Sequence, residues 1–288
     1  MEENLLKTCL YDKHVALGAL MSPFGGFIMP IQYTNITDEH NAVRHAAGMF
    51  DVSHMGEIFV SGPDADKFVN HVFSNDITGM EDGKILYGMM LYPNGTTVDD
   101  LLVYKEFEPN SYLLVVNASN IAKDYEWLCA QAEGYDVKVD NQSDVWGQIA
   151  LQGPEAEKYA VEVLGLTEAA ALGFYTYYRT CCPSDHCPCH PERSEGSSSS
   201  MIVSRTGYTG EDGFEVYAPH AVILEMWDKL LAAGVVPCGL GCRDTLRFEA
   251  GLPLYGHELS EEITPLEAGL GMFAKIKTKD EFIGRDAL

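Results

Sequence analysis

Basic residues are scarce in this sequence. Its 288 residues include 19 Lys and Arg against 43 Asp and Glu, a formal net charge of −24. Nucleic-acid binding needs positive surface to neutralise phosphates, so we expect no nucleic-acid partner. The sequence also lacks an apolar run of the roughly 20 residues that span a bilayer, and it lacks a basic, then apolar, leader. These absences predict a soluble, cytoplasmic protein without a membrane partner.

Several cofactor and hydrolase motifs are missing as well. No G-x-x-x-x-G-K-[ST] string occurs, and the stretch 239–244 lacks the third glycine of a dinucleotide fingerprint. The G-x-S-x-G elbow of serine hydrolases is also absent. The sequence therefore supports neither ATP nor NAD binding, and it does not favour covalent catalysis by serine.

The cysteine pattern is not that of a secreted disulfide framework. Four of the eight cysteines crowd into residues 181–189, and the others are scattered singly. With His186 and His190 the cluster could hold zinc, although a structural zinc site usually needs two separated ligand pairs. Because the stretch 181–200 also holds three prolines and a serine run, we favour a disordered surface insertion and no metal site.

A repeat is the clearest internal signal. The string VSGPDADKF at 60–68 recurs as LQGPEAEKY at 151–159. Each copy follows a run typical of a strand, passes through Gly-Pro, and continues with apolar residues at helical spacing. Two similar strand-then-helix units are therefore expected, and a chain of this length suggests two domains.

Further elements fit the same pattern. Strands are expected at 85–91, 98–105, 111–117, 201–205 and 214–218, and helices at 121–133 and 221–233. The mixture predicts a duplicated α+β fold, with subdomains of approximately 1–145 and 146–288.

Two adjacent acids, Asp99 and Asp100, open an apolar stretch after a turn. Because strand side chains alternate, only one can face the core side, and the alternation groups Asp100 with Leu102 and Tyr104. A carboxylate in that position is costly unless it is paired or functional. The alternative is that both acids finish a solvated turn.

The stretch 205–215 holds three glycines, which permit close approach of the backbone to a ligand. Glu215 lies inside an apolar run, and Arg243 lies beside another glycine turn. The two could form a buried ion pair or bind a ligand, and the residues alone leave both interpretations open.

Four motifs together resemble a known family. In order along the chain, DVSHMGE, DDLLVY, RTGYTGEDGFE and GLGCRDTLR are similar to the aminomethyltransferase (T-protein) of the glycine cleavage system, over about 17–288. The resemblance implies two ferredoxin-like α+β subdomains. It also implies that a C-terminal β-barrel domain of the family is missing.

The resemblance further implies a reaction. Tetrahydrofolate, as co-substrate, takes up the aminomethyl carbon held on the dihydrolipoyl arm of the H-protein. Ammonia is released and 5,10-methylenetetrahydrofolate is formed. A shortened chain that binds folate or the H-protein without turnover is the alternative, as is a related folate-dependent demethylase.

The same resemblance assigns roles to single residues. Asp100 matches the family's catalytic acid, with Asp99 as the second choice, and Glu215 with Arg243 matches the pterin anchor. His54 is not included among the site residues, and Met272 stands where several relatives carry an aromatic residue. The remaining folate-lining positions are Met55, Tyr87, Leu102, Val115, Asn117, Tyr208 and Tyr255.

Overall fold

The computed structural model describes residues 5–181 and 200–288. Its helices are α1 (Tyr11–Ala16), α2 (Ile36–His45), α3 (Ala65–Val72), α4 (Ile121–Gln131), α5 (Ala156–Glu162), α6 (His220–Ala232) and α7 (Leu240–Glu249). Its strands are β1 (Leu20–Phe24), β2 (Phe27–Gln32), β3 (Gly48–Asp51), β4 (Gly56–Ser61), β5 (Ile85–Leu91), β6 (Thr97–Lys105), β7 (Ser111–Val116), β8 (Lys138–Asn141), β9 (Trp146–Gln152), β10 (Tyr177–Cys181), β11 (Ser200–Ser204), β12 (Gly213–Pro219) and β13 (Val236–Pro237). No helix within these residues is long and apolar enough to cross a membrane.

The chain forms two compact units that alternate along the sequence. Unit 1 comprises Met1–His54 and Asp144–Leu252, and unit 2 comprises Met55–Ser143 and Pro253–Leu288. The break at 143/144 lies close to the expected division near residue 145. Residues before 55 and after 252, however, each belong with the opposite half of the chain.

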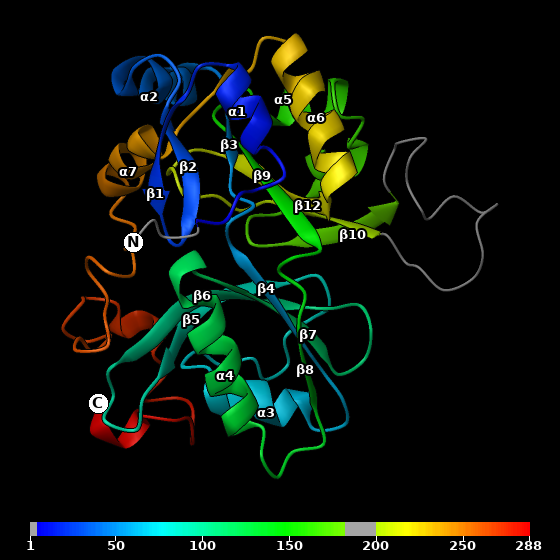
Figure 1. Ribbon diagram of the computed structural model, residues 1–288. Coiled ribbons are helices and arrows are strands. Elements are labelled where there is room, and N and C mark those ends of the chain that lie inside the picture. Colours follow the sequence, from blue (N-terminus) through cyan, green and yellow to red (C-terminus); the bar gives the residue numbers. More distant parts are fainter. Residues whose placement is uncertain (1–4, 182–199) are drawn as a thin grey trace. The chain divides into compact units, whose positions relative to one another are not determined.

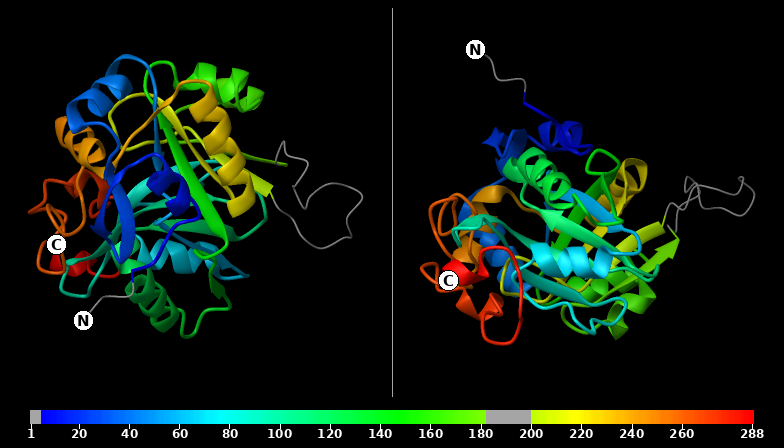
Figure 2. Two further views of the ribbon diagram at one scale, coloured as in Figure 1. Left: turned by 45° about the horizontal axis from the view of Figure 1, so that its top comes forward. Right: turned by 90° about the horizontal axis from the view of Figure 1, so that it is seen from below.

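Unit 1 is built on a six-stranded sheet of order β10-β11-β12-β9-β3-β13. Alternate residues of β9 and β12 are apolar and pack against α5 and α6. Figure 1 shows these two helices beside the two strands. Figure 2 shows α6 running along β9 from another direction. Trp227 of α6 is fully buried in this core. The β1-β2 hairpin and the α2-α7 pair complete the unit.

Unit 2 is built on a five-stranded sheet of order β5-β6-β7-β4-β8. Helices α3 and α4 cover one face of this sheet (Figure 1). The apolar spacing expected for the first repeat helix is confirmed, because Phe68, Val69 and Val72 of α3 are buried there. The opposite face packs in part against the C-terminal segment through Phe273 and Phe282.

The interleaving arises because the strand before each repeat pairs with the other repeat. Strand β3 precedes β4 in the chain but pairs antiparallel with β9. Strand β8 precedes β9 but pairs antiparallel with β4. The registers are equivalent, since Phe50 lies opposite Ala150 and Asp140 lies opposite Phe59. The six-stranded sheet therefore contains β3 and the five-stranded sheet contains β8, although each of these strands directly precedes a strand of the other sheet in the chain.

The turn after each repeat strand has a similar geometry. Gly62 and Gly153 have φ angles of 134° and 127°, which L side chains rarely adopt. A Cβ atom at either position would lie 2.5 Å from a backbone oxygen, that of Asp136 or of Ala46. The segments that lead into β8 and β3 therefore run so close that only glycine fits at these two positions.

The predicted elements are largely confirmed. Strands β5, β6, β7, β11 and β12 and helices α4 and α6 match their expected ranges to within two residues at each end. The α+β class is confirmed as well. The β1-β2 hairpin and the short strands β3, β8 and β13 were not predicted from the sequence. Residues 182–199 of the expected insertion lie outside the described part of the chain.

Candidate functional site

The two adjacent acids of β6 point to opposite faces of the five-stranded sheet. Asp99 is fully buried on the helix-covered face with Leu101, whereas Asp100 is partly exposed and shares its face with Leu102. The predicted alternation is confirmed. The expectation that Asp100 faces the core was wrong, because the acid buried in the core is Asp99.

Amide groups satisfy the Asp99 carboxylate. It accepts a hydrogen bond from the backbone N of Asn117 at 3.0 Å and from Nδ2 of Asn117 at 2.8 Å. Nδ2 of Asn120 donates a third at 2.7 Å. A buried carboxylate with three donors is stable in place, so Asp99 fixes the end of β7 beside β6.

Two of the predicted site residues, Tyr87 and Asn117, form hydrogen bonds with the Asp100 carboxyl. The Tyr87 hydroxyl donates to its Oδ2 at 3.0 Å, and Nδ2 of Asn117 donates to its Oδ1 at 2.9 Å. Burial, followed by the negative charge of Asp99, raises the pKa of Asp100 to about 7. Near neutral pH this carboxyl can therefore both donate and accept a proton.

Three expected folate contacts form one row across adjacent strands. Tyr87 of β5 lies opposite Leu102 of β6, which lies opposite Val115 of β7. Val115 in turn lies opposite Glu57 of β4. Side chains in such a row point to one face of the sheet. The row supplies aromatic and aliphatic surface next to Asp100, which lies two residues before Leu102.

The other expected residues of unit 2 lie near the ends of these strands. Met55 directly precedes β4 and is partly buried. The Tyr255 hydroxyl donates to the backbone oxygen of Thr97 at 3.3 Å, at the start of β6. Met272, by contrast, is 71% exposed.

In unit 1, Glu215 lies on the face of β12 opposite α5 and α6. Its Oε2 accepts a hydrogen bond from the Thr206 hydroxyl at 2.5 Å, and its Oε1 accepts one from Nε2 of Gln148 at 3.1 Å. Burial raises the pKa of Glu215, while Thr206 and then the charge of Arg243 oppose the rise. Each oxygen keeps a lone pair for a further donor.

Arg243 of α7 does not pair directly with Glu215. Its guanidinium lies over the Tyr208 ring, 4.4 Å from the ring centroid. Within the described residues the two groups share no ion pair, so the direct pairing considered from the sequence is not formed. Burial lowers the pKa of Arg243, and the charges of Tyr208 and Glu215 oppose this. Cation and carboxylate therefore influence each other through space while both remain available to a ligand.

The glycines of the 205–213 loop make room for a side chain of the repeat strand β9. A Cβ atom on Gly207 or Gly213 would collide with the amide of Gln152. That amide accepts a hydrogen bond from the Thr209 hydroxyl and donates one to the backbone oxygen of Thr206. The glycine density, interpreted from the sequence as room for a ligand, is thus explained at these two positions by Gln152.

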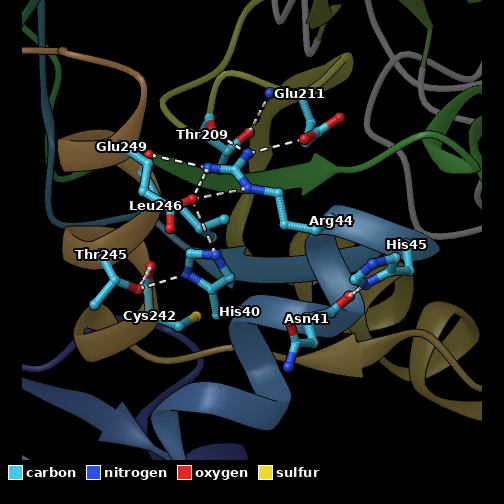
Figure 3. Close-up of polar contacts among 10 residues, drawn as sticks. All are labelled: His40, Asn41, Arg44, His45, Thr209, Glu211, Cys242, Thr245, Leu246 and Glu249. Atoms are coloured by element: carbon cyan, nitrogen blue, oxygen red, sulfur yellow. Dashed lines mark hydrogen bonds and ion pairs between the residues drawn. The ribbon is translucent and has the colours of Figure 1, made fainter.

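Arg44 of α2 ties this loop to α7, as Figure 3 shows. Its Nη1 donates to the backbone oxygen of Thr209 at 2.7 Å and pairs with Glu211 at 2.9 Å. Its Nη2 pairs with Glu249 of α7 at 3.0 Å. His40, one turn earlier on α2, contacts Thr245 and Glu249 of α7. These contacts fix the loop that carries Tyr208 to the helix that carries Arg243.

Three residues with buried polar groups, His54, Glu57 and Gln148, were not assigned to the site from the sequence. Both ring nitrogens of His54, both carboxyl oxygens of Glu57 and Oε1 of Gln148 have no hydrogen-bond partner within the described residues. Burial, then the charge of Arg243, lowers the pKa of His54 to about 3, so its ring is neutral. His54 and Glu57 both belong to the DVSHMGE string, so the family motif already contained them.

Comparison with known proteins identifies the family. The family model described as the GCVT N-terminal domain matches residues 10–278. Aminomethyltransferases from Lysinibacillus sphaericus and Caldanaerobacter subterraneus are 49% and 48% identical to this chain, over 100% and 99% of its length. The chain belongs to the aminomethyltransferase family. It is therefore an enzyme of the transferase class, and the resemblance seen in the four motifs is confirmed.

The aminomethyltransferase fold is matched in space as well. The crystal structure of glycine cleavage system aminomethyltransferase T from Bartonella henselae is similar, with a TM-score of 0.85 and 31% identity over 99% of this chain. The chain spans 74% of that structure and 75% and 73% of the two curated aminomethyltransferases. The similarity thus extends over the described parts of both units.

Proposed function

We propose that this chain transfers the aminomethyl carbon from the dihydrolipoyl arm of the H-protein to tetrahydrofolate. Ammonia and 5,10-methylenetetrahydrofolate are the products. Tetrahydrofolate supplies the nucleophilic nitrogen when bound. The observation that carries the proposal is Asp100, a carboxyl with a pKa of about 7, set beside a row of apolar and aromatic side chains.

Asp100 is proposed as the group that handles protons. The release of ammonia and the cleavage of a C–S bond both need a proton at the departing atom. Tyr87 and Asn117 fix the carboxyl through one oxygen each, which limits the directions in which it can present its proton. The carboxyl therefore needs no change of rotamer to present its proton to a bound ligand.

Glu215 is proposed as the anchor of the pterin ring, with Arg243 and Tyr208 beside it. The ring offers an amino group next to an N–H, and a carboxylate can accept from both. The structure fits such a ligand, since Glu215 keeps free lone pairs and Oε1 of its neighbour Gln148 has no hydrogen-bond donor within the described residues. A ligand with several N–H donors would satisfy both groups.

Calorimetric titration of tetrahydrofolate tests the anchor. Glu215→Gln replaces an acceptor oxygen with an amide donor and should weaken binding about tenfold to hundredfold, the usual value of hydrogen bonds to a charged group. Glu225→Gln is the matched control, because Glu225 lies on α6, which covers the opposite face of the same sheet. Its affinity should equal that of the parent.

Turnover with loaded H-protein tests the reaction. Asp100→Asn should bind tetrahydrofolate nearly as well as the parent but form 5,10-methylenetetrahydrofolate at least a hundredfold more slowly, as expected for a general acid or base. Normal turnover by this variant would remove Asp100 from the chemistry. Activity on sarcosine or dimethylglycine without H-protein would contradict the proposed substrate.

A further inference from the structure

Glu57 occupies a place in the row of expected folate contacts that no assignment explains. It lies on β4 directly opposite Val115, and the row continues through Leu102 to Tyr87. All four side chains therefore project from the same face of the sheet. Glu57 is the one carboxyl in a row that is otherwise apolar and aromatic.

The carboxyl of Glu57 has an unfavourable environment in the protein alone. The residue is 1% exposed, and neither of its oxygens has a hydrogen-bond partner within residues 5–181 and 200–288. Burial raises its pKa well above the ordinary value of a glutamate, so the group is held in its neutral, protonated form. A leucine would fill such a position without leaving polar atoms unsatisfied.

A carboxyl that weakens the fold and points to a ligand-binding face is typical of a functional residue. Resting on the proposed function, we propose that Glu57 is a further contact of the tetrahydrofolate site and binds its ligand as an uncharged carboxylic acid. The protonated group offers one O–H donor and one carbonyl acceptor. It therefore suits an uncharged amide-like edge of the ligand and not a carboxylate or a phosphate.

Two substitutions separate this role from a structural one. Glu57→Leu removes both hydrogen-bonding atoms, and Glu57→Gln keeps a neutral donor and acceptor of the same shape. Glu106→Leu is the control: Glu106 is also buried, follows the end of β6 and lies outside the row. The full chain is used for thermal unfolding without ligand and for calorimetric titration with tetrahydrofolate.

The expected results have opposite signs. Glu57→Leu should raise the melting temperature of the ligand-free protein by a few degrees, because it removes unsatisfied buried polar atoms. The same variant should weaken tetrahydrofolate binding about fivefold to tenfold, the loss of a neutral hydrogen bond or two. Glu57→Gln should bind within about twofold of the parent, and Glu106→Leu should leave the affinity unchanged.

Two outcomes would overturn the inference. One is a lower melting temperature, or loss of the fold, in Glu57→Leu, which would make the carboxyl a structural group. The other is an unchanged affinity in that variant. Absence of binding by the parent chain would count against the proposed function, and the melting temperatures of the ligand-free variants would still judge the role of Glu57.

Discussion

Asp100→Asn should stabilise the protein at alkaline pH although it slows turnover at least a hundredfold. The pKa of this carboxyl rises from 3.8 to about 7 on folding, so its ionisation opposes folding. Well below pH 3.8 the carboxyl is protonated in both the folded and the unfolded state, so it has no effect on stability there. Between about pH 4 and 7 the unfolded chain releases its proton first, so the cost grows, and above pH 8 it is constant.

The magnitude follows from the shift. About three units at 1.36 kcal/mol each set an upper limit of roughly 4 kcal/mol. Asp100 is partly exposed, and asparagine can still accept from Asn117 through its oxygen while its amide donates to the Tyr87 hydroxyl oxygen. We therefore expect a gain of about 2 kcal/mol at pH 8. At 2–4 °C per kcal/mol the melting temperature should rise by roughly 4–8 °C.

The assay is thermal unfolding of parent and variant at pH 4.5 and pH 8. Asp99→Asn is the matched control, because its new amide would face the backbone N–H of Asn117 and lose a hydrogen bond. Asp99→Asn should therefore lower the stability of the protein by about 1–3 kcal/mol. An equal gain for Asp100→Asn at both pH values, or no gain at pH 8, would refute the raised pKa.

Three further results are expected from the same structure. Gly153→Ala should destabilise unit 1 by about 2–4 kcal/mol in denaturant unfolding, because its Cβ meets a backbone oxygen; a loss below 1 kcal/mol would contradict the close approach. Arg44→Met should lower stability by roughly 2–3 kcal/mol and also weaken tetrahydrofolate binding through the Tyr208 loop, so unchanged affinity in calorimetry would separate the loop from the site. Because burial raises the pKa of Glu215, binding should weaken on acidification at a higher pH than an ordinary glutamate predicts, and a flat titration profile would argue against the anchor.

Local sequence patterns predicted most of the secondary structure. The alternating apolar residues of β6 and β12 and the helical spacing of α3 follow from packing of an apolar face in the two cores, and the order of residues records this directly. The pairing of β3 with β9 and of β8 with β4 depends on segments about 80 to 100 residues apart. A short strand carries too little pattern to reveal such a partner.

In the candidate site, too, local sequence predicted the residues but not their contacts. Motif resemblance indicated Asp100 and Asn117, but the structure reveals that one amide of Asn117 bridges Asp99 and Asp100. Alternation alone predicted that the two acids face opposite ways, yet which face is covered by helices is a tertiary property. The role of Gln152 in filling the space above Gly207 likewise involves residues distant in sequence.

The exchange of β3 and β8 sets the order in which a growing polypeptide can fold. Strand β3 leaves the ribosome long before β9, the strand it pairs with, so unit 1 cannot be completed until residue 252 has been synthesised. Unit 2 must wait longer still, for Lys279, whose ammonium donates to the backbone oxygens of Phe73 and Asn75. Pairings at such separation slow folding and prolong the exposure of strand edges. The nascent chain therefore passes most of its synthesis with the six-stranded sheet unfinished and with unit 2 lacking its C-terminal segment, and any chaperone that binds it would act during that interval.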